Sequence, residues 1–321
     1  MASNNMVERL TKVAELYYNH GLTQQEIAST IHIHRSEISR MLKQARKLGI
    51  VQIKVNSNIK LDGSLQNFLI DNFGLKDALV VPEPTDTNPF QNIGNYASNY
   101  LVQNISNNSV VGLSWGHTLA DTIHAIPETT DKKGITVVSL IGGPVGRLKN
   151  DYQSSKLVYS LSRKFNAKSE AIAAPALVGS KELKHELISN PNNELIFNYW
   201  TQLDYAVLGI GSSLITELSQ WQEFYKNSKF IDAFKDKSIV GDMLSRPFSI
   251  DGKLISSDKF NIIGMDLPDL KKVPNVIAVA FGQNKAEAIL GALKTGVLDV
   301  LITTDTTAMR IKSIYEHKSQ L

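Results

Sequence analysis

The sequence contains no cysteine among its 321 residues. This absence excludes a disulfide framework, a metal site built on thiolates and catalysis by a cysteine nucleophile, and it is typical of a reducing cytosol. No stretch of about eighteen consecutive apolar residues occurs, so we expect no membrane span. The segment from Met1 to Leu10 also lacks the apolar run of a signal peptide. We therefore expect a cytoplasmic protein that does not bind a membrane.

Charge is distributed unevenly along a chain that is 42 % apolar and long enough for two or three globular domains. Residues 1–60 carry nine Lys/Arg and four Asp/Glu, a balance of +5, whereas the remainder carries 25 and 27, a balance of −2. A small basic module joined to a near-neutral larger one fits a DNA-binding head on a small-molecule sensor. Charge alone is equally compatible with a chance asymmetry of the surface.

The segment from Leu22 to Lys43 has the apolar spacing of two short helices that cross steeply and share a core. This pattern is typical of a helix-turn-helix, whose second helix lies in the DNA major groove. A preceding helix is expected to end near Gly21, and Thr23 with Glu26 has the spacing of a capping box. The turn usually contains a glycine. Here His32 stands in it, which requires an unusual backbone conformation or a slightly different turn.

The recognition helix is predicted from about Arg35 to Lys47. Arg35 and Arg40 have the donor geometry to read guanine edges, whereas Ser39 and Lys43 are expected at phosphates. Each polar residue taken singly is equally typical of solvated surface, but together they occupy one helix face. The predicted DNA-binding residues are His34, Arg35, Ser36, Ser39, Arg40 and Lys43.

The alternation of apolar and polar residues over Val51 to Val55 predicts a strand after the recognition helix, and hence a winged arrangement. Residues 56–63 have the composition of a linker, so we place a DNA-binding domain at residues 1–56 and an effector domain at residues 57–321. An apolar helical stripe follows, which either packs on its own domain or helps dimerisation as a connector: Leu65, Phe68, Leu69 and Phe73.

From Ala78 onward, apolar strand-like runs alternate with helical patterns. This alternation predicts an α/β fold, a doubly wound and mostly parallel sheet covered on both faces. Several runs end in glycine-rich turns, at the sheet edge where ligands of such folds bind and where helix N-termini favour anions. The clearest predicted strands are Val110 to Leu113, Ile135 to Ile141, Tyr205 to Ile210, Val276 to Ala280 and Val300 to Thr303.

The segment from Gly112 to Gly116 matches the G-x-S-x-G nucleophile elbow of serine hydrolases. A hydrolase also needs an acid and then a histidine downstream. His185 lies in a predicted helix rich in lysine and glutamate, and His317 lies in a polar tail. No oxyanion motif of the His-Gly-Gly type precedes Ser114, and five-residue matches are common by chance. We therefore keep the hydrolase only as a minor alternative.

The chain resembles the SorC-type transcriptional regulators, the family of the sorbose operon, central glycolytic gene and deoxyribonucleoside regulators, from about Met6 to Thr307. It is most similar in appearance to the sorbose-operon branch. The motifs that carry the resemblance are Tyr17-Tyr18 to Leu22-Thr23-Gln24, Gly112-Leu113-Ser114-Trp115-Gly116-His117-Thr118-Leu119, Ile141-Gly142-Gly143-Pro144, Gly209-Ile210-Gly211-Ser212, Gly241-Asp242, Lys285-Ala286-Glu287-Ala288-Ile289 and Leu301-Ile302-Thr303-Thr304-Asp305-Thr306-Thr307-Ala308.

The resemblance implies an effector domain related to sugar-phosphate isomerases and deaminases, with a sugar or phosphosugar at the sheet edge. It implies that Asp242 contacts sugar hydroxyls and that Lys285 pairs with the phosphate, although a helix N-cap and a surface lysine are the plain alternatives. Phe281-Gly282 replaces a glycine pair that the family often has there. The implied effector-binding residues are Gly116, His117, Thr118, Gly142, Gly143, Gly211, Ser212, Asp242 and Lys285.

These observations predict a sugar-responsive transcription factor of a carbohydrate-utilisation operon, with operator DNA and a sugar or phosphosugar as partners. We expect a homodimer or homotetramer, because a single short helix-turn-helix binds little DNA. No catalytic residue, metal or cofactor is expected. The main alternative is a sugar-phosphate isomerase or deaminase with a DNA-binding head. Asp242 and His117 are its candidates for proton transfer, but they form no evident catalytic pair.

Overall fold

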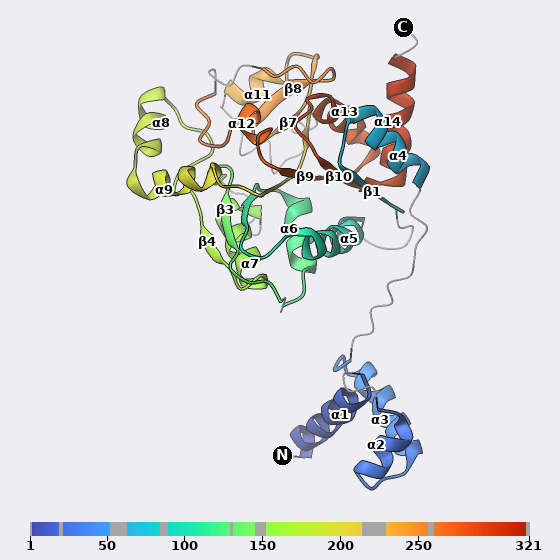
Figure 1. Ribbon diagram of the computed structural model, residues 1–321. Helices are drawn as coiled ribbons and strands as arrows, with labels where there is room; N and C mark the ends of the chain where they lie inside the picture. Colours follow the sequence, from blue (N-terminus) through green and yellow to red (C-terminus); the bar gives the residue numbers. More distant parts are fainter. Residues whose placement is uncertain are drawn as a thin grey trace. The chain divides into compact units, whose positions relative to one another are not determined.

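The computed structural model describes residues 2–18, 22–51, 63–83, 89–128, 131–144, 152–213, 229–255 and 260–318. The chain divides into two compact units, Met1–Ile59 and Lys60–Leu321. The first unit is helical, and the second contains a β-sheet with helices packed on it (Figure 1).

The first unit contains α1 (Ala2–Tyr18), α2 (Gln24–Thr30) and α3 (Arg35–Lys47). The predicted bounds of the recognition helix, Arg35 to Lys47, are therefore confirmed. All three helices contribute to the apolar interior, which consists of two small clusters. The buried residues of these clusters are Leu10, Val13, Ala14, Ile27, Ala28, Ile38, Leu42 and Ala45.

Hydrogen bonds of a capping box explain where α2 begins, and the backbone conformation of one residue explains how the chain turns into α3. The backbone N–H of Thr23 donates to Glu26 Oε2 over 2.8 Å, and the N–H of Glu26 donates to Thr23 Oγ1 over 3.2 Å, which confirms the capping box. His32 has φ 55°, so the predicted unusual backbone conformation is present in the turn. Gly21 and the predicted strand beyond Val51, including the wing, lie outside the described residues.

The second unit is built on a seven-stranded sheet in which every pairing is parallel, in the order β1-β10-β9-β5-β2-β3-β4. This sheet confirms the predicted α/β class. Its strands are β1 (Asp77–Val81), β2 (Val110–Leu113), β3 (Thr136–Ser139), β4 (Lys168–Glu170), β5 (Tyr205–Leu208), β9 (Asn275–Val279) and β10 (Val300–Thr304).

A small antiparallel sheet was not expected from the sequence and lies beside the main one. Its strands are β6 (Gly211–Ser212), β7 (Ile239–Met243) and β8 (Arg246–Ser249). The α-helix α13 (Ala286–Lys294) packs on β7 and β8. Gly241 on β7 and Gly291 on α13 leave the space for this close packing, because a Cβ at either position would clash with its neighbours.

Helices cover both faces of the main sheet (Figure 1). The helices α5 (Pro89–Asn104), α6 (His117–Ala125) and α7 (Ser154–Lys164) share one apolar core with one face. The core of the other face includes residues of α13 and of the remaining helices. These remaining helices are α4 (Gly63–Phe73), α8 (Lys181–Ile188), α9 (Pro191–Trp200), α11 (Lys229–Ala233), α12 (Leu267–Leu270) and α14 (Asp305–Lys318).

The apolar stripe of α4 packs mainly on its own unit. Leu65 and Leu69 are buried in the core, and the half-buried rings of Phe68 and Phe73 lie 5.7 and 5.2 Å from the ring of Tyr315 on α14. The stripe thus serves the fold, and a role in dimerisation stays a prediction. No helix in the described part of the chain has the length and apolar character needed to cross a membrane.

The strand order places a crevice at the centre of the main sheet. The chain runs outward through β2, β3 and β4 and then returns to β5 on the other side of β2. Helices that follow such neighbouring strands lie on opposite faces, so the sheet edge opens between the carboxyl ends of β2 and β5. The turns Ser114–Gly116 and Gly209–Gly211 follow these two strands.

Candidate effector-binding site

A cavity of about 440 Å³ lies at this crevice. Its walls come from the turns after β2, β5 and β9, from the start of α5 and from the β7–β8 turn. The residues that line it are Phe90, Ser114, Trp115, Gly116, His117, Thr118, Leu119, Gly209, Ile210, Gly211, Ser212, Asp242, Leu244, Ser245, Phe281, Gly282, Asn284 and Lys285.

The N-terminus of α6 forms one part of the wall. Gly116 precedes the helix with φ 137°, a backbone conformation that side chains rarely adopt. His117 stacks on Phe90 with 4.1 Å between ring centroids, and its Nε2 lies 3.2 Å from Asp121 Oδ2. The backbone amides of a first helical turn have no acceptor within the helix, and the helix dipole adds positive potential there. This wall therefore favours an anionic group of a ligand.

Asp242 on β7 provides the buried acceptor of the cavity. Its residue is 7 % exposed, and its Oδ2 accepts a hydrogen bond from the N–H of Ser245 over 3.1 Å. Among the described residues, nothing donates to its buried Oδ1. Gly211 on β6 is the antiparallel strand partner of Asp242 on β7. A Cβ at position 211 would lie 2.0 Å from Asp242 Oδ1. Glycine at position 211 thus leaves the room that the carboxylate occupies.

Lys285, a half-buried residue, places its ammonium group in the same cavity. It ends the short helix η4 (Gln283–Lys285), and its Nζ donates to the carbonyl of Ile210 over 3.3 Å. Burial lowers the pKa of Lys285, and burial raises the pKa of Asp242 to about 6. The attraction between the two charges opposes both shifts, and so does the Ser245 amide for Asp242. The pair offers a ligand one acceptor and one cationic donor.

The turn that joins β7 to β8 consists of two non-glycine residues in the left-handed region. Leu244 has φ 51° and Ser245 has φ 57°, and Met243 pairs with Arg246 across the turn. This is the arrangement of a type I′ hairpin, which usually requires Asn-Gly or Gly-Gly. Both residues are also buried, at 5 % and 2 % exposure. Because neither residue type favours this conformation, the sequence offered no pattern that identified the turn.

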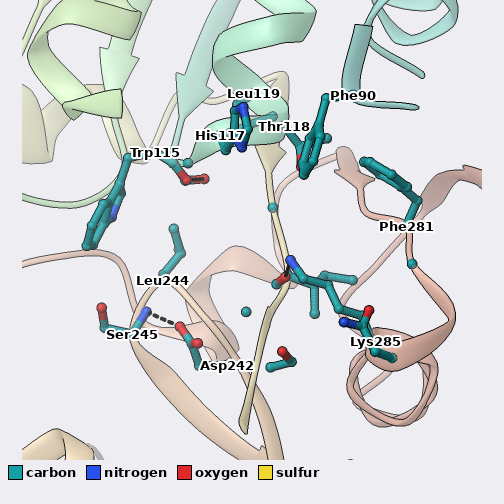
Figure 2. A pocket seen from close by; sticks show the side chains of 18 residues that line it. Phe90, Trp115, His117, Thr118, Leu119, Asp242, Leu244, Ser245, Phe281 and Lys285 are labelled. Atoms are coloured by element: carbon teal, nitrogen blue, oxygen red, sulfur yellow. Dashed lines mark hydrogen bonds between the residues drawn. The ribbon is translucent and has the colours of Figure 1, made fainter. Parts of the chain in front are cut away.

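Aromatic side chains form the remaining walls. Trp115 lies on one side of the cavity, and Phe90 and Phe281 lie on the other (Figure 2). The rings of Phe90 and Phe281 are 4.8 Å apart in an edge-to-face arrangement. Sequence reasoning missed Phe90 as a lining residue, because nothing in its neighbourhood indicates that the start of α5 reaches this edge of the sheet.

The structure brings most of the predicted effector-binding residues together at this one cavity. Gly142 and Gly143 are the exceptions, because neither of them lines it. A Cβ at Gly142 would lie 2.6 Å from the carbonyl oxygen of Ala174, and the N–H of Gly143 donates to that oxygen over 2.9 Å. Gly142 thus serves the close packing of two chain segments, whereas a Cβ at Gly143 would meet no described neighbour within 4 Å, and an effector contact at these two glycines stays a prediction. The predicted residues that do line the cavity are Gly116, His117, Thr118, Gly211, Ser212, Asp242 and Lys285.

The G-x-S-x-G segment does not have the features of a nucleophile elbow. Ser114 is 4 % exposed, and its Oγ lies 3.5 Å from the carbonyl oxygen of Trp115. A nucleophile elbow holds its serine in a strained conformation, yet Ser114 is not among the described residues with positive φ. His185 on α8 and His317 on α14 do not line the cavity. The hydrolase alternative thus has no support from geometry.

The predicted DNA-binding residues share one solvent-exposed surface of the first unit. They lie on α3 or, for His34, at its N-cap, and all six are exposed, whereas Ile38, Leu42 and Ala45 of the same helix are buried. Side chains that contact a DNA major groove must be exposed in the free protein, and these are. In the part of the chain that the structure describes, no cluster of His, Asp or Glu is suited to hold a metal ion.

Comparison with known proteins assigns the family. Residues 57–312 match the family described as "Putative sugar-binding domain". The sorbitol operon regulator of Klebsiella pneumoniae is 29 % identical over 311 residues, which cover 96 % of this chain and 98 % of that protein. The deoxyribonucleoside regulator of Bacillus subtilis (strain 168) is 29 % identical over 304 residues, or 92 % and 95 % of the two chains.

A solved structure extends the similarity to the whole fold. The crystal structure of the full-length sorbitol operon regulator SorC from Klebsiella pneumoniae matches with a TM-score of 0.82 and 28 % identity, and it covers 94 % of this chain and 97 % of its own. The chain belongs to the SorC/DeoR-type family of sugar-binding transcriptional regulators. Because its relatives are transcriptional regulators, the isomerase, deaminase and hydrolase alternatives are rejected.

Proposed function

We propose that this regulator binds operator DNA through residues 1–56 and a sugar or phosphosugar effector through residues 57–321, in the cytoplasm. The ligand occupies the cavity between β2 and β5, and the controlled genes form a carbohydrate-utilisation operon. The observation that carries the proposal is the combination of Asp242 and Lys285 with the N-terminus of α6 in one cavity of sugar size.

The chemistry of the lining supports a sugar phosphate over an unphosphorylated sugar. The carboxylate of Asp242, which lines the cavity, accepts a hydrogen bond from a ligand hydroxyl. Lys285 and the first amides of α6 attract a phosphate, whose charge also compensates the ammonium group of Lys285. The aromatic side chains of Trp115 and Phe90 pack against the apolar faces of the sugar.

The exposed face of α3 supports the DNA-binding part of the proposal. Arg35 and Arg40 read guanine edges, and Ser39 and Lys43 contact phosphates. Effector binding favours one of two arrangements of the protein, and these arrangements differ in how paired recognition helices meet an operator. The effector then changes operator affinity without any chemical change of its own.

A homodimer or homotetramer is part of the same proposal. One short helix-turn-helix contacts a single half-site, whereas two-fold operators require two recognition helices in one assembly. Light scattering on the full-length protein, at micromolar concentration and with or without DNA, measures the mass directly. A monomer under both conditions contradicts this part of the proposal and leaves the rest unaffected.

A thermal-shift screen with sugars and phosphosugars, repeated with operator DNA, tests the effector assignment. Lys285→Ala is expected to abolish the effector's influence on DNA binding and to leave basal DNA affinity unchanged. Lys272→Ala is the matched control, because Lys272 pairs with Asp269 over 2.7 Å on the surface, away from the cavity. An unchanged effector response in Lys285→Ala contradicts the phosphate site. Conversion of the ligand at a rate that depends on Ser114, His117 or Asp242 contradicts the regulator-only assignment.

A further inference from the structure

Arg246 is a buried cation that lies behind the wall of the cavity rather than in it. It is the first residue of β8, it is 4 % exposed, and it does not line the cavity. Its guanidinium donates from Nε to Asp266 Oδ1 over 2.7 Å, from Nη1 to the carbonyl of Leu244 over 3.2 Å and from Nη2 to the carbonyl of Gly264 over 2.8 Å. One side chain therefore joins three separate acceptors.

Two of these acceptors, the carbonyls of Leu244 and Gly264, lie at the cavity and at the end of a strand of the main sheet, respectively. Leu244 is the first residue of the left-handed turn and lines the cavity. Gly264 forms an antiparallel bridge with Ile141, and the N–H of Met265 donates to the carbonyl of Leu140 over 2.8 Å. Segment 264–265 is thus attached to the chain that leaves β3. Arg246 connects the cavity turn to the end of a strand of the main sheet.

The turn needs such a connection because its conformation is unfavourable for its residues. Non-glycine residues in the left-handed region persist only where surrounding contacts hold them, and such strain is concentrated at ligand sites. The Leu244–Ser245 turn is held from two directions. The carboxylate of Asp242 accepts from the Ser245 amide, and the guanidinium of Arg246 binds the Leu244 carbonyl. The first contact also orients Asp242.

We propose that Arg246 is a positioning residue of the effector site. By holding the Leu244 carbonyl against segment 264–266, it keeps the Ser245 amide in place for Asp242 Oδ2, and this fixes the orientation of the carboxylate that lines the cavity. A planar fork with several donors is needed for three acceptors, and lysine cannot supply it. The role in ligand binding rests on the proposed function, whereas the role in holding the turn does not.

The first experiment needs no ligand. Amide hydrogen exchange of Ser245, measured by NMR on the full-length protein, is expected to be roughly tenfold faster in Arg246→Lys, because the turn opens more often. The matched control is Lys164→Met. Lys164 has a 13 % exposed side chain, and its Nζ donates to the carbonyl of Ile126 over 2.6 Å and to Glu128 Oε1 over 2.8 Å, at a place remote from the turn in the fold. Its loss should leave Ser245 exchange unchanged.

A rescue variant separates positioning from general stability. Ser245→Gly in the Arg246→Lys background removes strain at one of the two left-handed positions, so it is expected to restore most of the protection of the amide at position 245. A global loss of stability would not be repaired at this one amide. Unchanged Ser245 exchange in Arg246→Lys, or equal acceleration in Lys164→Met, overturns the proposal.

A second measurement uses D-fructose 6-phosphate as the probe, in isothermal titrations. The Kd of Arg246→Lys is expected to rise on the order of tenfold over that of the unaltered protein, with no change in Lys164→Met. An unchanged Kd together with faster Ser245 exchange overturns the link between the turn and the ligand. If the unaltered protein binds neither this phosphosugar nor any other in the screen, the proposed function fails, and the exchange measurements still decide whether Arg246 holds the turn.

Discussion

The two units of this protein present their functional side chains in opposite ways. In the first unit, the residues proposed to contact DNA follow one another on α3, are exposed to solvent and rest on a small core below them. In the second unit, the residues of the cavity come from strands and turns that are far apart in the sequence, and its charged residues are withdrawn from solvent, Asp242 buried and Lys285 half-buried. A DNA-reading surface must reach outward, whereas a small-molecule site must replace the water around its ligand.

This difference has an energetic consequence. An exposed arginine on a helix keeps its hydration and costs the fold little. A buried carboxylate loses hydration, which is why the pKa of Asp242 is raised to about 6. The second unit therefore gives up stability at its site, and the first does not.

Ile38→Ala tests whether the units are independent. Ile38 is fully buried in the core of the first unit, so its truncation is expected to cost about 2–5 kcal/mol there. Operator binding should be lost, while the shift in melting temperature on adding an effector should persist, as measured by calorimetry. Ile289→Ala, the same change at an equally buried position on α13, should affect the second unit instead. Loss of the effector response in Ile38→Ala would contradict independence.

Asp242→Asn tests the cost of burying a charge. Because the pKa of Asp242 in the fold exceeds its ordinary value of 3.8, the folded state binds the proton more tightly. The free energy of unfolding therefore falls as pH rises from about 4 to about 6 and stays lower above that range. Asparagine does not titrate, so the variant lacks this loss. The free energy of unfolding of the variant, relative to that of the unaltered protein, should therefore be up to about 3 kcal/mol more favourable at pH 7 than at pH 3.

Urea unfolding of both proteins at pH 3, 5 and 7 measures this difference. The net gain at pH 7 is reduced because Lys285 loses the attraction of its partner. Effector affinity should fall in the same variant, since the carboxylate that lines the cavity becomes a neutral amide. Parallel pH profiles for the two proteins would show that Asp242 carries no such cost.

Arg40→Ala tests direct contact with bases. The side chain is exposed on α3, so the fold should survive and operator affinity should fall by roughly 1–3 kcal/mol. The loss should be greater for operator than for random DNA in a fluorescence-anisotropy titration. Lys47→Ala, in the last turn of the same helix, is the control and should weaken both DNAs alike. Equal losses for both DNAs in Arg40→Ala would assign Arg40 to a phosphate.

Thr23→Ala tests how much the side-chain cap of α2 contributes to the stability of the first unit. Removing the side-chain cap of α2 is expected to cost about 1 kcal/mol of stability, whereas Thr23→Ser should retain most of the cap. Chemical denaturation followed by helical circular dichroism measures both variants. The second unit should be unaffected. Equal stability of Thr23→Ala and the unaltered protein would mean that tertiary packing alone sets the start of α2.

Sequence patterns were most informative where structure depends on neighbours along the chain. The bounds of α3, the cap at Thr23 and the unusual backbone at His32 follow from local sterics and hydrogen bonding, and the structure has all three. The parallel strands are also visible as apolar runs, because both faces of the main sheet are buried. The match of β2 to Val110–Leu113 is an example.

Long-range contacts account for what the sequence did not reveal. Gly142 belongs to a segment that resembles a ligand-binding turn, yet the close approach of segment 174–175 explains this glycine. The Leu244–Ser245 turn lacks the Asn-Gly or Gly-Gly typical of its type, and the Arg246 side chain that binds it is itself held by the distant residues Asp266 and Gly264. Phe90 and Leu244 reach the cavity only through the arrangement of α5 and β7 in space.

By itself, the sequence determined the helix-turn-helix and the parallel α/β class, whereas the residues proposed to bind an anion and hydroxyls came from its resemblance to a known family. Periodicity, caps and residue chemistry act over a few positions, so they can be recognised in a linear string. Only the tertiary structure decided which glycines face the cavity, that Asp242 keeps one carboxylate oxygen unpartnered, and that Arg246 supports the turn beside it. These features depend on burial and on contacts between distant segments, and both exist only after the chain has folded.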